Sequence, residues 1–389
     1  MLTRNQALVI VALCTLIGAT WLSRYLYLRS TFITGTVNPS EIIIPAIFDL
    51  TGSLDYQGTR SLQGARIAEA EINSRGGLKG KLVRIVFEDA RTNPQDAVMA
   101  FKMLIDAHKP PVVIGFSGSS EVMACARIAN ERHVILFSTG AASPNITQAG
   151  EYVFRNRLSG SIEAGHLADI CRTRLHYQSG MIINIETDYG VGYGDAFRDQ
   201  FERDGGTIVA KESFLQGTAD FHTLLARIKS RLPLDFIYLA SHAREAGNIL
   251  RQAREEGITV QWLASNAVEG PDLAELAGPA ADGLLLTVAQ YDPDSDDAKY
   301  FNDLYRKEYG RDSEMFAAHA YDAVQLLARL ISEHGYDSKA IHDALLMIRD
   351  YRGASGVTTF DANGDVQKPV AVRRFQAGKF IDVAESSLK

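Results

Sequence analysis

Residues 42–94 read IIIPAIFDLTGSLDYQGTRSLQGARIAEAEINSRGGLKGKLVRIVFEDARTNP and contain one complete strand–helix–strand unit. Ile42–Phe48 is a short, β-branched apolar run, which is typical of a strand buried on both faces. In Ser61–Asn73 apolar residues recur at helical spacing, and Gly76-Gly77 then ends the helix, because glycine accepts the left-handed conformation of a C-cap. Leu82–Phe87 is the second strand. This order predicts a parallel α/β sheet.

A candidate ligand-binding loop follows the first of these strands. Residues 49–52 interrupt the apolar run, and Glu88-Asp89 ends the second strand. Ligand sites in open α/β sheets lie beyond the carboxyl ends of the strands. The loop at residues 51–58 is therefore the first candidate segment, and Tyr56 and Gln57 are its candidate contact side chains.

Strands and helices continue to alternate in two series of similar length. The first series ends near residue 157, and the second runs from about residue 161 to residue 266. The pattern predicts two α/β lobes, each a doubly wound parallel sheet. The remaining predicted elements are helices at 297–309, 316–334 and 340–350 and strands at 284–289, 356–360 and 370–375.

Composition excludes some classes of function. The chain has 389 residues, 46% hydrophobic and 22% charged, with a formal net charge of −7. Phosphate binding needs a basic face, so nucleic acid is not an expected partner. The sequence has no zinc-type CxxC pair, HExxH or P-loop motif, and neither a metal nor another cofactor is expected. Cys125 and Cys171 are expected to be small buried side chains, with a bridge between them as the alternative.

The first forty residues differ from the rest of the chain. Residues 7–22, ALVIVALCTLIGATWL, are almost wholly apolar, and Arg24 and Arg29 follow them. At about 1.5 Å per residue this run is slightly shorter than a bilayer core, but an extension to Leu28 spans it. No clean small-x-small cleavage site follows. Residues 1–40 are therefore predicted to be an uncleaved membrane anchor with a spacer, and a cleaved signal peptide is the alternative.

Two serine-containing loops follow consecutive strands of the first series. Residues 117–120, Ser-Gly-Ser-Ser, lie between a strand and a helix, where free N–H groups and hydroxyls can hold a carboxylate. A helix N-cap in a tight turn is the other explanation. Residues 141–143, Ala-Ala-Ser, follow the next strand and offer a further N–H group and hydroxyl. Together these loops are the predicted anion site.

Three residues of the second series follow strands in the same way. Tyr189 can cover a small ligand with its ring, although packing within its own loop explains it equally well. His242 and Asn266 follow two further strands, and a structural histidine and a turn asparagine are the alternatives. No nucleophile is paired with a base, so the chain is not expected to be an enzyme.

Several short phrases, in order over residues 41–380, resemble the type I periplasmic solute-binding proteins of ABC importers, in the branched-chain amino acid (leucine/isoleucine/valine) binding group. The phrases are LTG at 50–52, QGA at 63–65, INSRGGLKG at 72–80, ED at 88–89, VIG at 113–115, SS at 119–120, DYG at 188–190, ILRQAR at 249–254, AYDA at 320–323 and FDANGD at 360–365. The resemblance implies a periplasmic protein that binds an amino acid or a related small polar solute and delivers it to membrane permease subunits. A membrane-anchored ligand sensor with the same module is the alternative function.

The resemblance also implies two lobes joined by three crossovers, with the ligand in the cleft between them. By position, lobe 1 is expected to comprise residues 41–157 with 285–354, and lobe 2 residues 158–284 with 355–389. The crossovers are expected near residues 157–158, 283–285 and 354–356.

Transferred by position, the ligand carboxylate would lie at Ser119 and Ser120, with Ala141 and Ser143 completing this part of the site. Tyr189 would pack over the ligand from lobe 2.

The chain departs from the family pattern at two of the implied contacts. His242 lies where relatives often have a tyrosine that contacts the ligand. Asn266 lies where relatives that bind aliphatic amino acids place a glutamate for the ligand ammonium. Asparagine offers no charge, and charge-assisted hydrogen bonds are about twice as strong as neutral ones. Either Asp188 or Glu269 replaces that glutamate, or the ligand is an amide, a urea or a simple carboxylate.

Overall fold

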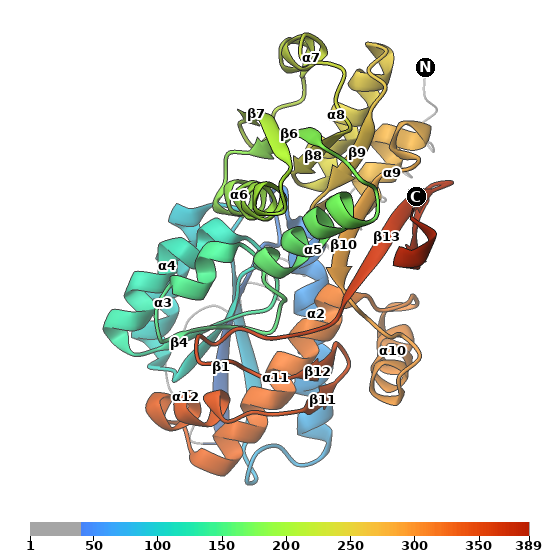
Figure 1. Ribbon diagram of the computed structural model, residues 1–389. Helices are drawn as coiled ribbons and strands as arrows, with labels where there is room; N and C mark the ends of the chain where they lie inside the picture. The colour runs from blue at the N-terminus through green and yellow to red at the C-terminus, as the bar shows by residue number, and fades with distance from the viewer. Residues whose placement is uncertain (1–39, 389) are drawn as a thin grey trace, which may run out of the picture. The chain divides into compact units, whose positions relative to one another are not determined.

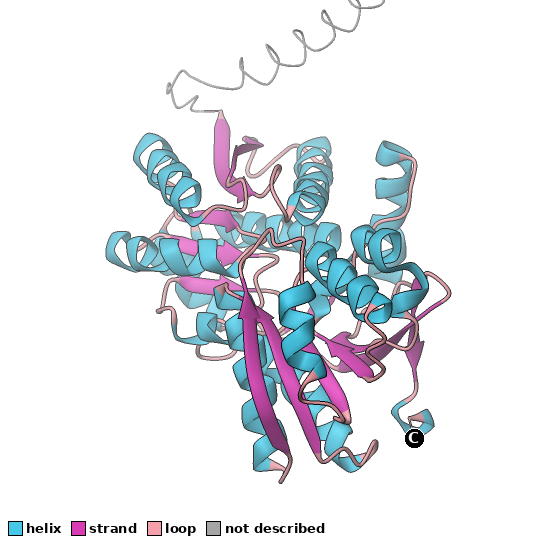
Figure 2. Ribbon diagram, turned by 90° about the horizontal axis from the view of Figure 1, so that it is seen from above, coloured by secondary structure: helices cyan, strands magenta, loops and turns pink. Residues whose placement is uncertain are grey.

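Two β-sheets organise residues 40–388, which are the residues that the computed structural model describes. Both sheets belong to one unit of contacting residues that begins at Ile42. The first sheet with its helices forms lobe 1, and the second forms lobe 2 (Figure 1). Helices flank the strands in the perpendicular view as well (Figure 2). The predicted fold class, two α/β lobes, is confirmed.

Lobe 1 is built on a five-stranded sheet in the order β2-β1-β3-β4-β5. Its strands are β1 (Glu41–Phe48), β2 (Leu82–Asp89), β3 (Val112–Gly115), β4 (Ile135–Ser138) and β5 (Val153–Arg155). β1 pairs in parallel with β3, β3 with β4, and β4 with β5. The order reverses at β1, and ligands of doubly wound sheets lie in the crevice at such a reversal.

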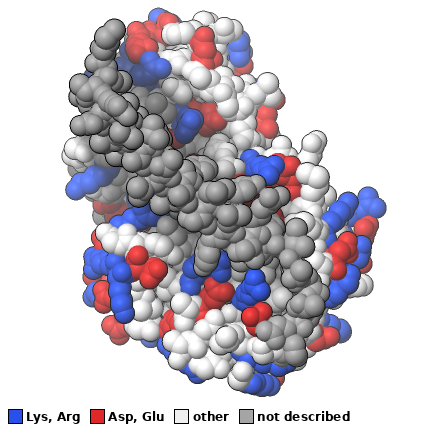
Figure 3. Space-filling model, turned by 180° about the vertical axis from the view of Figure 1, so that it is seen from behind, with Lys and Arg blue, Asp and Glu red and all other residues white. Residues whose placement is uncertain are grey.

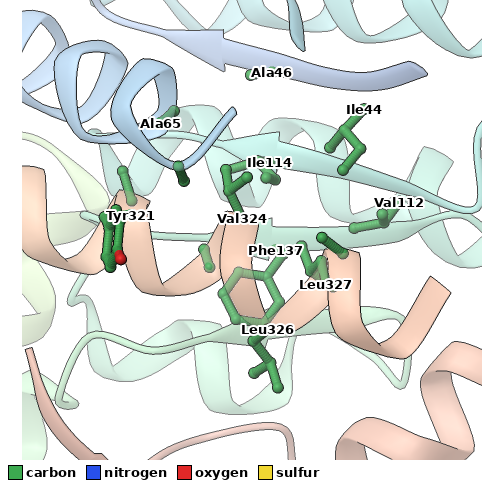
Figure 4. Packing of buried hydrophobic residues seen from close by; sticks show 14 of the residues in the cluster. Ile44, Ala46, Ala65, Val112, Ile114, Phe137, Tyr321, Val324, Leu326 and Leu327 are labelled. Carbon is green, nitrogen blue, oxygen red and sulfur yellow. The ribbon is translucent and has the colours of Figure 1, made fainter. Parts of the chain in front are cut away.

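Helices cover both faces of this sheet. α2 (Asp55–Ser74) and α11 (Met315–His334) pack on one face, and α3 (Pro94–His108) and α4 (Ser119–Arg132) pack on the other. Alternate residues of β1 divide between the two cores, as the strand period of two requires. Figure 4 shows side chains of the sheet and of α11 meeting in the first of these cores, among them Ile44, Ile114, Phe137 and Val324.

The packing of α2 on α11 depends on a glycine. A Cβ added to Gly64 of α2 would lie 2.0 Å from the carbonyl oxygen of Ala317 in α11. Only the absence of a side chain lets the two backbones approach so closely.

Lobe 2 is built on a seven-stranded sheet in the order β14-β13-β10-β9-β8-β6-β7. The strands from β10 to β7 are parallel, and β13 and β14 add an antiparallel edge. The strands are β6 (Ser179–Ile185), β7 (Thr207–Phe214), β8 (Phe236–Ala240), β9 (Gln261–Ala264), β10 (Leu285–Ala289), β13 (Val370–Gln376) and β14 (Lys379–Val383). The helices are α5 (Gly160–Thr173), α6 (Asp188–Arg203), α7 (His222–Lys229), α8 (Ala243–Glu255) and α9 (Pro271–Ala277).

Local signals set the helix ends. Asn93 caps α3 by accepting hydrogen bonds from the backbone N–H groups of Gln95 and Asp96, at 2.8 and 3.2 Å. The helix expected from Ser61 instead begins at Asp55, and Tyr189, expected in a loop, lies on the first turn of α6. Tyr56 and Gln57 are therefore on the first turn of α2 rather than in a loop. An acidic residue at this end is favourable to the helix dipole.

Strand pairing differs from two of the expected lobe boundaries. Residue 285 does not start a return to lobe 1, because β10 pairs with β9 in the lobe 2 sheet. The tail after residue 354 does not pass at once to lobe 2. Its strand β12 (Gly356–Thr358) pairs with β11 (Tyr351–Gly353), and Phe360 and Val366 are in the lobe 1 core. The chain therefore crosses after β10 and again just before β13, where Gln290 N–H donates to the carbonyl of Pro369.

Two further helices complete lobe 1, one before α11 in the sequence and one after it. They are α10 (Asp296–Tyr309) and α12 (Ser338–Leu346). α10 begins at the N-cap Ser295, whose hydroxyl accepts from Ala298 N–H, and ends at Gly310, whose φ of 68° is left-handed.

The predicted anchor lies almost wholly outside the described residues, of which Ser40 is the first. None of the helices in residues 40–388 has the length and apolarity to cross a bilayer.

Cys125 and Cys171 are buried free thiols, so the alternative of a bridge is wrong. Acidic and basic side chains are interspersed on the part of the surface that Figure 3 shows in colour.

Candidate functional site

The site is built at the reversal of the lobe 1 sheet, where β1 and β3 end. Asp49 follows β1 and is fully buried. Its carboxylate accepts hydrogen bonds from the backbone N–H groups of Thr92 and Ser117, at 2.8 and 3.2 Å. The loop after β3 is thereby fixed to the loop after β1.

A second carboxyl lies behind this loop. A Cβ on Gly118 would be 1.9 Å from Oε2 of Glu121. Burial raises the pKa of Glu121 to about 8, with a further contribution from the charge of Asp49, and burial raises the pKa of Asp49 to about 6. Near neutral pH Glu121 therefore keeps its proton, while the Asp49 carboxylate is stabilised by the two backbone N–H groups that it binds.

Ser119 joins the loops of two neighbouring strands. Its Oγ accepts a hydrogen bond of 3.1 Å from the backbone N–H of Ser143, which follows β4. The two predicted serine loops are therefore in contact, as the convergence of adjacent strand ends requires.

The loops of lobe 1 also contact α6 of lobe 2. The Ser143 hydroxyl donates to the carbonyl of Asp188 at 2.8 Å, and the backbone N–H of Asp188 donates to Ser120 Oγ at 3.1 Å. A Cβ on Gly192 would lie 2.8 Å from Ser143 Oγ. The two lobes are therefore in direct contact here, and the absence of a side chain at Gly192 makes room for Ser143.

A cavity lies between the lobes beside these contacts. Its space is about 20 Å³, which is room for roughly one water molecule. A solute larger than water does not fit within this space alone. The cavity is lined by Leu54, Gln57, Ser117, Gly118, Ser119, Gly140, Arg157, Tyr189, His242, Asn266, Ala267 and Phe316.

A larger hollow of about 460 Å³ adjoins this cavity, because Asn266 and Phe316 line both. Its wall also includes Tyr56 of lobe 1 and the ion pair of Glu269 with Arg373, whose atoms are 2.6 Å apart. Volumes of this size are typical of sites for small molecules.

The structure brings together most, but not all, of the predicted site residues. The cavity is lined by Gln57, Ser119, Tyr189, His242 and Asn266, and Tyr56 lines the larger hollow.

Three predicted residues do not line the cavity. Ser120 and Ser143 instead hold the lobes together through Asp188. The backbone N–H of Ala141 donates to Ser138 Oγ at 3.1 Å, so that N–H is already bonded within lobe 1. Both charged candidates to replace the family's glutamate, Asp188 and Glu269, are also absent from the cavity lining.

On the lobe 2 side, Tyr189 and Asn266 form one wall. The Tyr189 hydroxyl donates to Asn266 Oδ1 at 2.8 Å and accepts from the backbone N–H of Ala267 at 2.9 Å. Burial raises the pKa of Tyr189, so its hydroxyl keeps its proton. The ring of His242 lies 5.5 Å from the Tyr189 ring.

Behind this wall is Glu163, which sequence reasoning did not identify. Asn266 Nδ2 donates to its Oε2. The hydroxyl of Tyr193 also donates to Oε2, at 2.6 Å, and the backbone N–H of Ala289 donates to Oε1, at 2.9 Å. Burial raises the pKa of Glu163. Its oxygens are thus occupied, and Asn266 has neither end of its amide free.

Arg157 is the second functional candidate that sequence reasoning missed. It lies on the first crossover, is 2% exposed, and lines the cavity. Its guanidinium lies over the Phe316 ring, with 5.7 Å from Cζ to the ring centroid. The only sequence signal was its place, two residues after Arg155 at the end of a buried strand.

Burial lowers the pKa of His242, and its Nδ1 has no hydrogen-bond partner among residues 40–388. It is therefore a neutral imidazole near pH 7. Arg157 is the one charged side chain in the cavity lining. No cluster of three or more potential metal ligands occurs within the described part of the chain.

Comparisons with known proteins agree with this architecture. The periplasmic binding protein family model matches residues 41–379. The leucine-specific-binding protein of Salmonella typhimurium is 29% identical over 336 residues, which cover 84% of this chain and 88% of that protein.

Two solved structures are similar along nearly their whole lengths. A leucine-binding protein of Thermotoga maritima is 29% identical and has a TM-score of 0.82, covering 88% of this chain and 98% of that one. The branched-chain amino acid transporter substrate-binding protein of Streptococcus pneumoniae, solved with isoleucine, is 27% identical with a TM-score of 0.78, covering 88% of this chain and all of that one. The resemblance found in the sequence is thereby confirmed, and the chain belongs to the periplasmic binding protein family, in the branched-chain amino acid group.

Proposed function

We propose that this protein is the periplasmic substrate-binding component of an ABC importer, and that it holds an amino acid or a related small polar solute between its lobes. The observation that carries the proposal is the cavity at the reversal of the lobe 1 sheet, which both lobes line with buried polar groups. The relatives named for leucine, and the one solved with isoleucine, support a ligand of this size.

Lobe closure is the mechanism. The solute first meets lobe 1, where the Ser119 hydroxyl and the loop after β3 offer polar contacts. Rotation about the three crossovers then brings Tyr189 over it. The bonds of Ser143 and Ser120 to Asp188 form only when the lobes are close, so they stabilise the closed form.

The adjoining hollow sets the size of the solute. A molecule whose polar end lies near Ser119 can extend past Asn266 and Phe316, which line both spaces. Tyr56 and Gln57 are then side-chain contacts from the first turn of α2.

The closed form delivers its solute to permease subunits in the membrane and performs no chemistry on it. The state of Tyr189 supports this, because its ring lies beside His242, burial raises its pKa, and its hydroxyl is already hydrogen-bonded. Residues 7–28 anchor the protein at the outer face of the inner membrane.

Titration calorimetry of the purified protein tests the binding function. The solutes are leucine, isoleucine, valine, their amides, their des-amino acids and urea. We expect heat from at least one class and a loss of that heat in Tyr189→Ala. The exposed Tyr300, which is absent from both cavity linings, provides the control variant Tyr300→Ala. Absence of heat with every solute contradicts the proposal.

A further inference from the structure

Arg157 forms no ion pair with an acidic side chain of the described chain, although its charge partly offsets the burial that raises the pKa values of Glu163 and Glu314. It is 2% exposed, and no ion pair within 4.0 Å involves it among residues 40–388. Its Nη1 donates to the sulfur of Met315, a weak acceptor, and its Nε has no hydrogen-bond partner in the same residues. Buried charges in proteins are normally paired and hydrogen-bonded, so this one is an exception that needs a reason.

Arg155, two residues earlier, shows what a satisfied arginine looks like in this place. It is 0% exposed, and its Nε and Nη2 bind the two oxygens of Asp365 at 2.6 and 2.8 Å. Its Nη1 donates to the carbonyl of Ser143 at 2.7 Å. The same crossover therefore holds one buried arginine with a complete set of acceptors and another, facing the cavity, without one.

The cavity that Arg157 lines contains no acidic side chain. The nearest buried carboxylate of lobe 2, Glu163, already accepts hydrogen bonds from Tyr193, Asn266 and Ala289. Glu314 lines only the larger hollow, where burial raises its pKa to about 7. An ammonium group placed beside a carboxylate in this cavity would meet Arg157 and a neutral His242 but no anion.

We propose that Arg157 binds the carboxylate of the solute, and that the cavity selects a carboxylic acid without an α-ammonium group. The inference rests on the proposed function and narrows its solute class. A guanidinium presents several N–H groups in a fixed plane, which suits a carboxylate. The carboxylate of the solute would give Arg157 the ion pair that Asp365 gives to Arg155. A zwitterionic amino acid instead brings a cation for which the cavity has no partner.

The test uses three matched series with one carbon skeleton each: butanoate, 4-methylpentanoate and phenylacetate, their amides, and the α-amino acids 2-aminobutanoate, leucine and phenylglycine. Calorimetry at pH 7.5 should give the acids at least about 10-fold higher affinity than the amide and the amino acid of the same skeleton. The variant Arg157→Met should lose at least about 30-fold in affinity for the acids, the usual cost of removing one partner of a buried charge pair.

A measurement on the solute-free protein separates binding from folding. Arg157→Met removes an unpaired buried charge and places an apolar side chain beside Met315 and Phe316, so its melting temperature should rise. Arg155→Met strands Asp365, so its melting temperature should fall. A lower melting temperature for Arg157→Met contradicts the view that this charge awaits a solute.

The outcomes for the inference and for the function are distinct. Tighter binding of leucine than of 4-methylpentanoate, or acid binding that Arg157→Met leaves unchanged, overturns the inference and leaves solute binding intact. Binding of no member of any series overturns both.

Discussion

The hydroxyl of Tyr189 donates to Oδ1 of Asn266 at 2.8 Å, which joins the first turn of α6 to the segment after β9. The same hydroxyl accepts from the backbone N–H of Ala267, and Asn266 donates in turn to the buried Glu163. The two residues predicted as separate ligand contacts are therefore one preorganised surface. The position of this surface depends on the carboxyl group of Glu163, which does not line the cavity.

Removing this hydroxyl should loosen the surface. Tyr189→Phe leaves Asn266 Oδ1 and Ala267 N–H without their partner, and a buried unsatisfied group costs about 1–3 kcal/mol. We expect the free energy of unfolding in urea to fall by that amount and solute affinity to fall with it. Tyr300→Phe, at a half-exposed hydroxyl that donates to Glu71, should change stability much less. Equal effects of the two variants would contradict the buried network.

A side chain at Gly192 should weaken the contact between the two lobes. A Cβ there would lie 2.8 Å from Ser143 Oγ and 2.9 Å from Cδ of Pro144, both in lobe 1. Gly192→Ala should therefore favour the open form and reduce solute affinity by roughly 10-fold, which is about 1.4 kcal/mol. In the presence of solute, small-angle scattering should show a larger radius of gyration for Gly192→Ala than for the wild type. Gly165→Ala, whose nearest atom is 3.9 Å away, is the control and should bind as the wild type does.

The packing of α2 on α11 should tolerate no side chain at Gly64. Because its Cβ would lie 2.0 Å from the carbonyl oxygen of Ala317, Gly64→Ala should cost about 1–3 kcal/mol or more of stability. Gly165→Ala in α5 has space, so it should gain roughly 0.5–1 kcal/mol from better helix propensity. Denaturation in urea measures the free energy of unfolding of both variants. If Gly64→Ala were more stable than the wild type, α2 and α11 would be able to move apart without cost, which would contradict the prediction.

The pair of Asp49 and Glu121 should make stability fall as pH rises. Burial raises the pKa of Glu121 from 4.5 to about 8, so between these values the folded protein binds more protons than the unfolded chain does. Stability is then greatest below pH 4.5 for this group and is lost as pH rises toward 8, by up to about 1.4 kcal/mol per pH unit for one proton.

Glu121→Gln removes this titration, so its free energy of unfolding should depend less on pH between 4.5 and 8. Glu131→Gln, at an exposed position near the end of the same helix, should keep the wild-type dependence. A pH profile identical in the wild type and Glu121→Gln would refute the assignment to Glu121.

Much of the fold was predictable because its signals are local. The apolar run Ile42–Phe48 and the glycines after α2 define elements without reference to distant residues. The convergence of Ser119, Tyr189, His242 and Asn266 was also predictable, because parallel strands bring their carboxyl ends to one edge of each sheet.

The positions of the crossovers were not predictable in this way. β10 is an apolar strand that suits either sheet, and only its pairing with β9 places it in lobe 2. Likewise Ser143 and Ser120 have the composition of an anion site, yet their hydroxyls serve contacts with Asp188. Which partner a hydroxyl takes depends on the approach of the two lobes.

The sequence by itself determined the α/β class, the family and the edge of each sheet at which the proposed site lies, since hydrophobic period, turn residues and strand direction are properties of short segments. Only the tertiary structure decided which charges face the cavity. Asp365, more than 200 residues away in the sequence, forms an ion pair with Arg155, whereas no described carboxylate lies within ion-pair distance of Arg157. Burial and pairing between distant segments, rather than residue type, give one arginine a structural ion pair and leave the other without one, and this difference is why we propose Arg157 as the contact for the solute.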